Sequence, residues 1–469
     1  MSIATKGVRA CPLLPAVYEY DDACALAEAY EQGAADPVDI TKRCLDAAPT
    51  REGVYISLTK DRALREAEAS RARYAAKMPL SPLDGVPLAW KDLFDVAGSI
   101  TTAGSDLRRN NPPSPVDGPL PTLATRAGMV CPGKVNTTEF AFSSTGTNPH
   151  YGNPVNPHSK EGQPRIPGGS SCGSGVAVAS GIVPLAMGSD TGGSIRIPSH
   201  FNGLTGFKPT VGHYNRGNMV FLAKTLDTPG PMTRSVRDVI AMDRILRGIP
   251  CPCRNPEPMP IKGRRFVLEK NLLSDPLVED AVKAMLKAVI GRLQKAGAYV
   301  NIRDVPPFQE AIKVIAAGWF MGVEAFTQIR DILDDPERAK RIDQRIRKRA
   351  EGSRNMDPSR VILSLFARQD LIAAVGKDLN GDVLITPTVG HGAPLLNELL
   401  QNEETFFKYI VANVRLTTPG NLMDMPGLTI PAGLSKNGMP LSVLLSAASG
   451  LDELVLQTGL AAEKTILYT

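Results

Sequence analysis

The chain has 469 residues, of which 43% are hydrophobic and 22% are charged, and its formal net charge is +5. This composition is typical of a globular protein with a large buried core. The basic residues form no single block and only 5% of the residues are aromatic, which argues against a surface for nucleic acids. No run of about 18 apolar residues occurs, so we expect no membrane-spanning helix.

The seven cysteines and five histidines disfavour disulfide and metal chemistry. An odd number of cysteines in a long chain argues against a disulfide framework, and Cys251-Pro252-Cys253 is too tightly spaced for a zinc or redox pair. The N-terminal residues, with Lys6 and Arg9, lead into a proline-broken segment and not into the apolar run of a signal peptide. We therefore expect reduced thiols in a cytoplasmic protein without a metal or cofactor.

The sequence pattern near the beginning of the chain changes from helical to strand-like after residue 77. Asp21 and Asp22 are capping residues before a run of helix formers, and residues 20–77 are predicted to form an N-terminal helical layer. Residues 83–96 then indicate a short, mostly apolar strand that contains Lys91. Burying an ammonium group is costly, so two interpretations stay open. Lys91 points to solvent from an edge strand, or it is buried with a lowered pKa and acts as a base.

The middle of the chain alternates between loops and regular elements. Prolines at 112–121 indicate an exposed connection within the loop-rich region 100–165, and residues 227–231 indicate a turn before a helix over 235–246. A strand, a helix and a second strand over 263–304 favour a largely parallel sheet with covering helices.

The C-terminal part begins with predicted helices over 308–379, in which the charge run 338–354 is typical of a solvated helix face. Strand patterns and a closing helix follow at 383–388, 428–431, 441–445 and 451–464. Since no repeat or linker interrupts the chain, we predict one large α/β domain over 1–469, with a central mixed β-sheet covered by helices on both faces. Residues 80–250 would form the catalytic core, and residues 260–469 would complete the sheet and contribute to the substrate pocket.

The most informative stretch covers residues 168–210. Two clusters rich in Gly and Ser, at 168–175 and 188–194, flank an apolar run. Glycines let backbone N–H groups approach a ligand closely, and serine hydroxyls are candidate nucleophiles or proton carriers. This arrangement predicts a hydrolase whose reaction takes place between the two clusters.

Three other motifs offer weaker interpretations. Residues 169–173 match the G-x-S-x-G nucleophile elbow, with His391 as the plausible base, but the preceding residues are polar and proline-broken where a strand is required. Residues 57–60 match S-x-x-K without the partner motifs that should follow. Residues 128–135 nearly match a phosphate-binding loop but end in Val135, where Ser or Thr would hold magnesium.

The combination of the two clusters with an upstream lysine resembles the amidase signature family. The family's GGSSGGS, GTDTGGSIRIP and GLKPT segments are matched by residues 168–174, 188–198 and 206–210, and its lysine strand by residues 85–92. Connecting and C-terminal segments are also similar, at 133–141, 148–152, 421–431 and 438–441. The resemblance covers nearly the whole chain and implies the fold of that family.

The resemblance implies a triad of serine, serine and lysine. Lys91 corresponds to the catalytic lysine, Ser170 to the bridging serine that follows a cis peptide bond, and Ser194 to the acylated nucleophile. An oxyanion hole is implied for the backbone N–H groups of Thr191, Gly192, Gly193 and Ser194. With no histidine in these motifs, a desolvated Lys91 is the base that would activate Ser194 through Ser170.

Further residues are expected around this triad. Ser171 is a supporting hydrogen-bonding residue, and Asp190 and Arg196 are expected to hold the loop, unless they are ordinary surface charges. Cys172 occupies a position where the family usually has Gly. The substrate pocket is expected near Ala141, Ser144 and other residues of 141–147, 310–330 and 413–424, including Trp319, Phe320, Phe326, Arg415 and Met423.

The sequence thus predicts an amidohydrolase that cleaves a linear C–N bond of a small molecule, in an amide or in a carbamate or ureido relative, through an acyl-enzyme on Ser194. The alternatives are one chain of a glutamine-dependent amidotransferase complex that modifies mischarged tRNA with partner chains, an ester or urethane hydrolase, and a non-catalytic scaffold. The amidotransferase branch carries an acidic residue near the segment matched by 413–421, where this chain has no carboxylate. We expect no nucleic-acid or membrane partner, and a homodimer stays open.

Overall fold

The computed structural model describes residues 11–250, 255–257 and 259–467. A mixed 11-stranded sheet runs through the molecule in the order β1-β3-β2-β4-β6-β5-β10-β11-β9-β7-β8. Its strands are β1 (Tyr55–Leu58), β2 (Leu88–Lys91), β3 (Gly133–Val135), β4 (Leu185–Asp190), β5 (Thr205–Lys208), β6 (Thr228–Thr233), β7 (Arg265–Glu269), β8 (Tyr299–Arg303), β9 (Val383–Pro387), β10 (Gly427–Leu434) and β11 (Pro440–Ser446).

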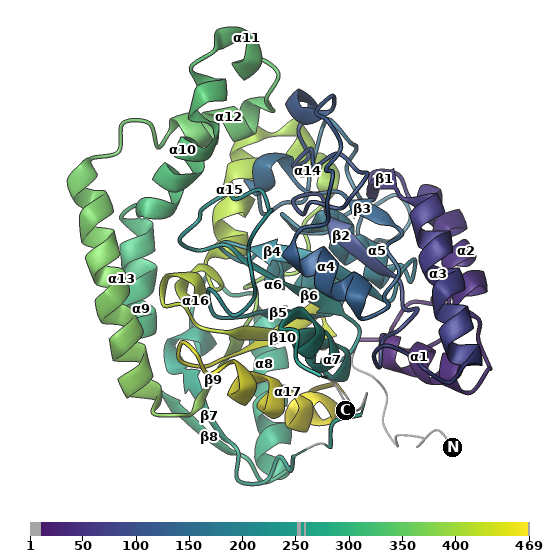
Figure 1. Ribbon diagram of the computed structural model, residues 1–469. Coiled ribbons are helices and arrows are strands. Elements are labelled where there is room, and N and C mark those ends of the chain that lie inside the picture. The colour runs from purple at the N-terminus through teal and green to yellow at the C-terminus, as the bar shows by residue number, and fades with distance from the viewer. Residues whose placement is uncertain (1–10, 251–254, 258, 468–469) are drawn as a thin grey trace.

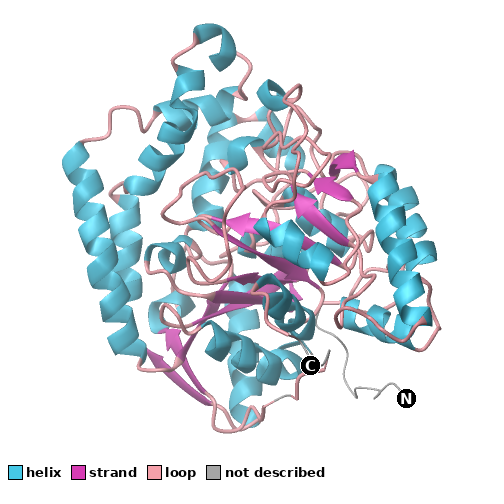
Figure 2. Cartoon of the chain, in the orientation of Figure 1, coloured by secondary structure: helices cyan, strands magenta, loops and turns pink. Residues whose placement is uncertain are grey.

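Helices surround this sheet (Figures 1 and 2). The α-helices are α1 (Ala23–Glu31), α2 (Pro37–Ala47), α3 (Lys60–Ala75), α4 (Pro119–Arg126), α5 (Cys172–Ala179), α6 (Arg196–Asn202), α7 (Val236–Leu246), α8 (Asp280–Lys295), α9 (Pro306–Ala316), α10 (Phe320–Leu333), α11 (Pro336–Ala339), α12 (Gln344–Glu351), α13 (Pro358–Leu379), α14 (Leu396–Gln401), α15 (Glu403–Val414), α16 (Thr418–Leu422) and α17 (Asp452–Leu467). Short 3-10 turns lie at η1 (Ala48–Thr50), η2 (Asp106–Arg108), η3 (Glu139–Ala141) and η4 (Lys270–Leu273).

The sheet is buried on both sides, as the sequence predicts. On β10, Leu428 and Ile430 belong to one apolar cluster with residues of α8 and α17. Thr429 points to the opposite face because side chains alternate along a strand. It pairs with Gly206 of β5, and a Cβ on that glycine would overlap Ser199 of α6. Helices therefore cover both faces of a continuous sheet, and the prediction of a single α/β domain with a mixed sheet is confirmed.

Several predicted elements are confirmed at the same places. The side chain of Asp22 caps α1 by accepting a hydrogen bond from the N–H of Ala25 at 2.8 Å. Residues 263–304 form β7, α8 and β8, and the two strands pair in parallel. The helices predicted over 308–379 are α9 to α13, of which α9 and α13 pack side by side along one edge of the molecule (Figure 1).

Three predictions about local structure are wrong. Residues 55–58 form strand β1 inside the predicted helical layer. Residues 119–126 form α4, whose first turn tolerates Pro119 and Pro121 because the N–H groups there have no helical partner. Residues 228–231, predicted as a turn, belong to strand β6 between β4 and β5. β5 pairs with β6 through Met232 and Thr233, beyond the prolines of that strand.

Among the described residues, no helix is long and apolar enough to cross a membrane. Cys24, Cys44, Cys131 and Cys172 are buried free thiols. The predictions about the first ten residues and about the Cys251-Pro252-Cys253 segment lie outside the described residues.

Candidate active site

Two parallel strands end at the same edge of the sheet and bring the predicted site together. β2 pairs in parallel with β4 through Trp90 and Met187, and the two strands end at Lys91 and Asp190. The carboxyl ends of parallel strands are where α/β proteins place their ligands. β2 lies between β3 and β4, and Lys91 is fully buried. The interpretation of Lys91 as a solvent-facing residue on an edge strand is therefore wrong.

Lys91 is a buried amine among hydroxyl groups. Its Nζ atom lies 2.6 Å from Oγ of Ser170 and 2.9 Å from Oγ of Ser189. Burial lowers the pKa of Lys91 to about 7, although the nearby Cys172 and Asp227 act in the opposite direction. A large share of the amine is thus neutral near neutral pH, and its lone pair can accept a proton from Ser170. Ser189 was not singled out from the sequence, although it lies within the second Gly/Ser cluster.

Ser170 and Ser194 come from two loops that contact each other. Ser170 follows a cis peptide bond from Gly169, as the family resemblance implies, and lies just before α5. Ser194 lies in the loop between β4 and α6 and keeps 8% exposure. The N–H of Ser171 donates to the backbone oxygen of Ser194 at 3.3 Å, and the Ser171 hydroxyl bonds the backbone of Ser189. The two loops are thereby held together.

Asp190 and Arg196 shape the Ser194 loop from inside. Both are fully buried, and Nη2 and Nε of Arg196 donate to the two carboxylate oxygens of Asp190 at 2.9 and 3.0 Å. Asp190 also accepts hydrogen bonds from the N–H groups of Gly193 and Ile195. Burial opposes ionisation, but Arg196 outweighs it and holds the pKa of Asp190 below its ordinary value. The interpretation of this pair as surface charges is wrong.

The peptide between Gly192 and Gly193 is fixed at both of its polar groups. Its carbonyl oxygen accepts hydrogen bonds from the hydroxyls of Thr417 and Thr418 at 2.7 and 3.1 Å, and its N–H donates to Asp190 at 2.8 Å. Gly193 has φ of +134°, and a Cβ there would overlap Oγ1 of Thr417, so the position requires glycine. In the part of the chain that the structure describes, the loop N–H groups left to face an oxyanion belong to Thr191, Gly192 and Ser194.

Asp227 connects this loop to the wall of the pocket. It accepts hydrogen bonds from the hydroxyl of Thr191 and from the N–H of Leu222, the latter at 2.7 Å. Burial raises the pKa of Asp227 to about 6. Its role gave no signal in the sequence, where the neighbouring prolines indicated a turn.

Cys172 and His391, on which the alternative mechanisms depend, are poorly placed for nucleophilic chemistry. Burial raises the pKa of the Cys172 thiol to about 12, so the sulfur stays protonated and unreactive near neutral pH. Nδ1 of His391 lies 2.9 Å from the carbonyl oxygen of Gly392. Residues 166–171 form no strand, which the G-x-S-x-G elbow requires.

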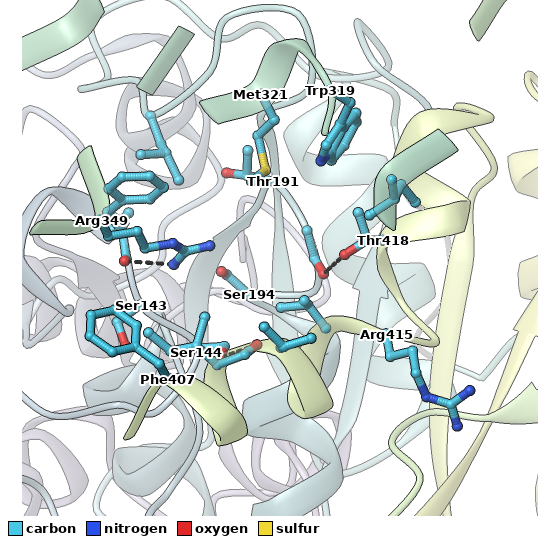
Figure 3. A pocket seen from close by; sticks show the side chains of 18 of the residues that line it. Ser143, Ser144, Thr191, Ser194, Trp319, Met321, Arg349, Phe407, Arg415 and Thr418 are labelled. Atoms are coloured by element: carbon cyan, nitrogen blue, oxygen red, sulfur yellow. Dashed lines mark hydrogen bonds between the residues drawn. The ribbon is translucent and has the colours of Figure 1, made fainter. Parts of the chain in front are cut away.

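Ser194 opens into a cavity of about 600 Å³, shown in Figure 3. Helices α9, α12 and α15 and the loops around residues 141–144 and 191–194 form its walls. Apart from a few hydroxyl groups and three cations, the lining is apolar. It consists of Ala141, Phe142, Ser143, Ser144, Thr191, Gly192, Ser194, Leu222, Ile312, Ile315, Ala316, Trp319, Met321, Lys348, Arg349, Gly352, Phe407, Ile410, Val411, Val414, Arg415 and Thr418.

The predicted pocket residues divide into two groups. Ala141, Ser144, Trp319 and Arg415 line the cavity. Phe320, Phe326 and Met423 do not, and their side chains are buried in apolar clusters of the core. The expected pocket region thus contributes residues to a cavity beside Ser194, but amphipathic helices give no direct sign of which face meets the cavity.

Helix α12 contributes to the pocket, which its sequence does not indicate. Lys348 and Arg349 lie in the charge run that was predicted to be a solvated helix face, yet both line the cavity. Arg349 is only partly exposed, and its guanidinium carbon lies 4.2 Å from the centre of the Phe142 ring. A run of charges does not reveal which of them faces a cavity.

The comparisons with known proteins agree with this geometry. The family model described as Amidase matches residues 39–456. The chain belongs to the amidase family. It is thus a hydrolase of carbon–nitrogen bonds other than peptide bonds, as the sequence predicts.

This amidase is similar to curated proteins with different names. It is 32% identical over 415 residues to the 2-amino-5-chloromuconic acid deaminase of Comamonas testosteroni, covering 85% of this chain and 87% of that protein. It is 30% identical over 450 residues to a glutamyl-tRNA(Gln) amidotransferase subunit of Zymomonas mobilis subsp. mobilis, covering 88% and 90%. A solved structure titled as an amidase superimposes with a TM-score of 0.83 at 28% identity, covering 95% of this chain and all of that one.

Proposed function

We propose that this amidase cleaves a linear amide of a small molecule through an acyl-enzyme on Ser194, with Lys91 as the base and Ser170 as the proton bridge. The observation that carries the proposal is the buried Lys91 amine, which lies 2.6 Å from the Ser170 hydroxyl. The next residue, Ser171, donates its N–H to the backbone oxygen of Ser194, and Ser194 lines the cavity. A serine hydroxyl is a weak nucleophile until a base removes its proton, and the described residues that line the cavity include no histidine.

In the acylation step, neutral Lys91 accepts the proton of Ser170 while Ser170 accepts the proton of Ser194. Oγ of Ser194 then attacks the carbonyl carbon of the substrate. The negative charge that develops on the carbonyl oxygen faces the N–H groups of Thr191, Gly192 and Ser194. A single donor of this kind typically contributes about 3 kcal/mol to the stability of the transition state.

The same relay completes the reaction in reverse. Protonated Lys91 returns a proton through Ser170 to the leaving nitrogen, so the C–N bond breaks as the amine departs. Water then attacks the acyl carbon, with Lys91 and Ser170 again accepting a proton. The bond between the acyl carbon and Oγ of Ser194 breaks as the relay returns that proton to Oγ. The products are a carboxylic acid and ammonia or an amine, and the enzyme returns to its starting protonation state.

The amidotransferase alternative is less well supported by the charges around the cavity. Glutamine carries an ammonium group beside its carboxylate. The described residues that line the cavity include three cations and no Asp or Glu, so an ammonium group would find no opposite charge there. An ester or urethane hydrolase would use the same relay, and a substrate panel distinguishes it.

Two further expectations, about cellular location and oligomeric state, belong to this proposal. A cytoplasmic location is supported by the buried thiols that form no disulfide, such as Cys24 and Cys44. A homodimer stays a prediction, which light scattering on the purified protein would decide.

The proposal is tested with a fluorophosphonate probe and a panel of amides, carbamates, ureides and esters. Mass spectrometry of the labelled wild-type protein should place the phosphonyl group on Ser194, and the wild type should release ammonia or amine from members of the panel. Labelling of another residue, or absence of labelling in the folded protein, would contradict the assignment of Ser194.

A further inference from the structure

The cations of the substrate cavity differ in how they are neutralised. Nη1 of Arg415 lies 2.6 Å from Oδ2 of Asp275, and in Figure 3 the Arg415 side chain points away from Ser194. Nζ of Lys348 lies 2.7 Å from Oε2 of Glu403, and the Lys348 side chain is 61% exposed. Two of the three cations are therefore already paired with carboxylates.

Arg349 has no such partner among the described residues. Its one hydrogen bond there runs from Nη1 to the carbonyl oxygen of Phe142 at 2.8 Å, and its guanidinium stacks over the Phe142 ring. A guanidinium has five N–H donors in a planar fork, so most of them are unused. Figure 3 shows the guanidinium pointing into the cavity, toward the side where Ser194 lies.

Arg349 also keeps its charge at this position. Burial lowers the pKa of Arg349 to about 10, so the group stays positive at neutral pH. The rest of the cavity wall around it is largely apolar, including Leu222, Ile410 and Trp319. Since a cation in an apolar cavity is costly without an anion, its surroundings favour a negatively charged group on the bound molecule.

Resting on the proposed function, we infer that the natural substrate is an amide whose acyl part carries an apolar body and a terminal carboxylate but no ammonium group, and that Arg349 binds this carboxylate. The fork of Arg349 matches the two oxygens of a carboxylate. The absence of acidic side chains among the described lining residues excludes a matching site for an ammonium. Arg349 thus determines specificity, whereas Ser194 carries out the chemistry.

The test compares three amides of the same length: the monoamide of adipic acid, hexanamide and ε-aminocaproamide. They end in a carboxylate, a methyl group and an ammonium, respectively. For the wild type, kcat/KM should be about 10- to 100-fold higher for the adipic monoamide than for hexanamide, and lowest for ε-aminocaproamide. Equal values for the adipic monoamide and hexanamide, or a preference for the ammonium compound, would overturn the inference.

Substitutions test whether the Arg349 side chain is the source of the carboxylate preference. Arg349→Gln should reduce the ratio of the two kcat/KM values to about one, and Arg349→Lys should retain part of it because the charge remains without the fork. Arg347→Gln is the matched control, since it removes the same charge from the same helix outside the lining of the cavity. It should leave the ratio within about threefold. An equal loss in Arg347→Gln, or an unchanged ratio in both Arg349 variants, would contradict the role of Arg349.

A binding experiment separates this inference from the proposed mechanism. In Ser194→Ala, calorimetry should detect tighter binding of the adipic monoamide than of hexanamide, and Arg349→Gln in that background should remove the difference. If fluorophosphonate fails to label Ser194 but the binding preference is present, the mechanism fails and the inference stands. If Ser194 is labelled but no carboxylate preference appears in binding or turnover, the inference fails and the mechanism stands.

Discussion

The floor and the wall of the substrate cavity are built in different ways. The floor is the loop between β4 and α6, of which Thr191, Gly192 and Ser194 line the cavity. Lys91, Asp190 and Arg196 do not line it and are fully buried and hydrogen-bonded. The wall consists mainly of helices α9, α12 and α15, which present apolar side chains and cations to the cavity. The geometry of this loop is fixed, because Asp190 accepts the Gly193 N–H and Thr417 and Thr418 donate to the carbonyl oxygen of Gly192. Substitutions in the wall would leave the hydrogen bonds of the loop intact. The wall is therefore suited to determine which substrate binds.

The largest expected effect comes from removing Ser194, the proposed nucleophile at the floor. Ser194→Ala should lower kcat by about 10⁴-fold or more, because the residual rate depends on binding and the oxyanion donors alone. The measurement is turnover of the best amide from the panel, with thermal melting as a check on folding. A folded Ser194→Ala protein with near wild-type turnover would show that the floor does not carry the chemistry.

A smaller effect is expected from distorting the oxyanion loop. In Gly193→Ala, the new Cβ would overlap Thr417 in a backbone conformation that favours glycine, so the neighbouring N–H donors should move. We expect kcat to fall by about 10²- to 10³-fold and the melting temperature to fall as well. Gly162→Ala is a control for glycine replacement at positive φ, since a Cβ at Gly162 has open space around it. Equal losses of kcat in the two variants would contradict a special role for this loop.

The smallest of these effects should come from the wall. Trp319 lines the cavity and packs against Phe320. Trp319→Ala should raise KM for an apolar amide by about tenfold through lost contact area, while kcat changes by less than about threefold. A loss confined to kcat would instead show that the wall takes part in the chemical step.

The difference between the floor and the wall of the cavity also explains which residues could be predicted from the sequence. Lys91, Ser170, Ser194 and the Asp190–Arg196 pair were predicted because their motifs are long, and the structure brings them to one place. Strand β6 was missed because its prolines indicate a turn, and only the pairing with β4 and β5 shows that the sheet accepts them. Arg349 was missed because a dense charge run is usually solvated. Burial of a side chain by distant helices leaves no pattern in the local sequence.

The donors of the proposed oxyanion hole could be predicted only in part from the sequence. The motif implied Gly193 among the donors, but its N–H is bonded to Asp190 in the structure. Asp227 and Thr417, which hold Thr191 and Gly192, lie far from the motif in sequence. A local motif places the loop, and contacts from distant residues decide which of its N–H groups are available.

The central claim is that Lys91 activates Ser194, and the most direct test is the pH dependence of fluorophosphonate labelling. The probe has no titrating group in the relevant range, so the rate reports the activation of Ser194. Because the pKa of Lys91 is about 7 and the neutral amine is the base, the labelling rate should rise about tenfold per pH unit below that value and level off above it. This inflection should vanish in Lys91→Ala together with most of the rate. A pH-independent labelling rate in the wild type, or an inflection that persists in folded Lys91→Ala, would contradict the account.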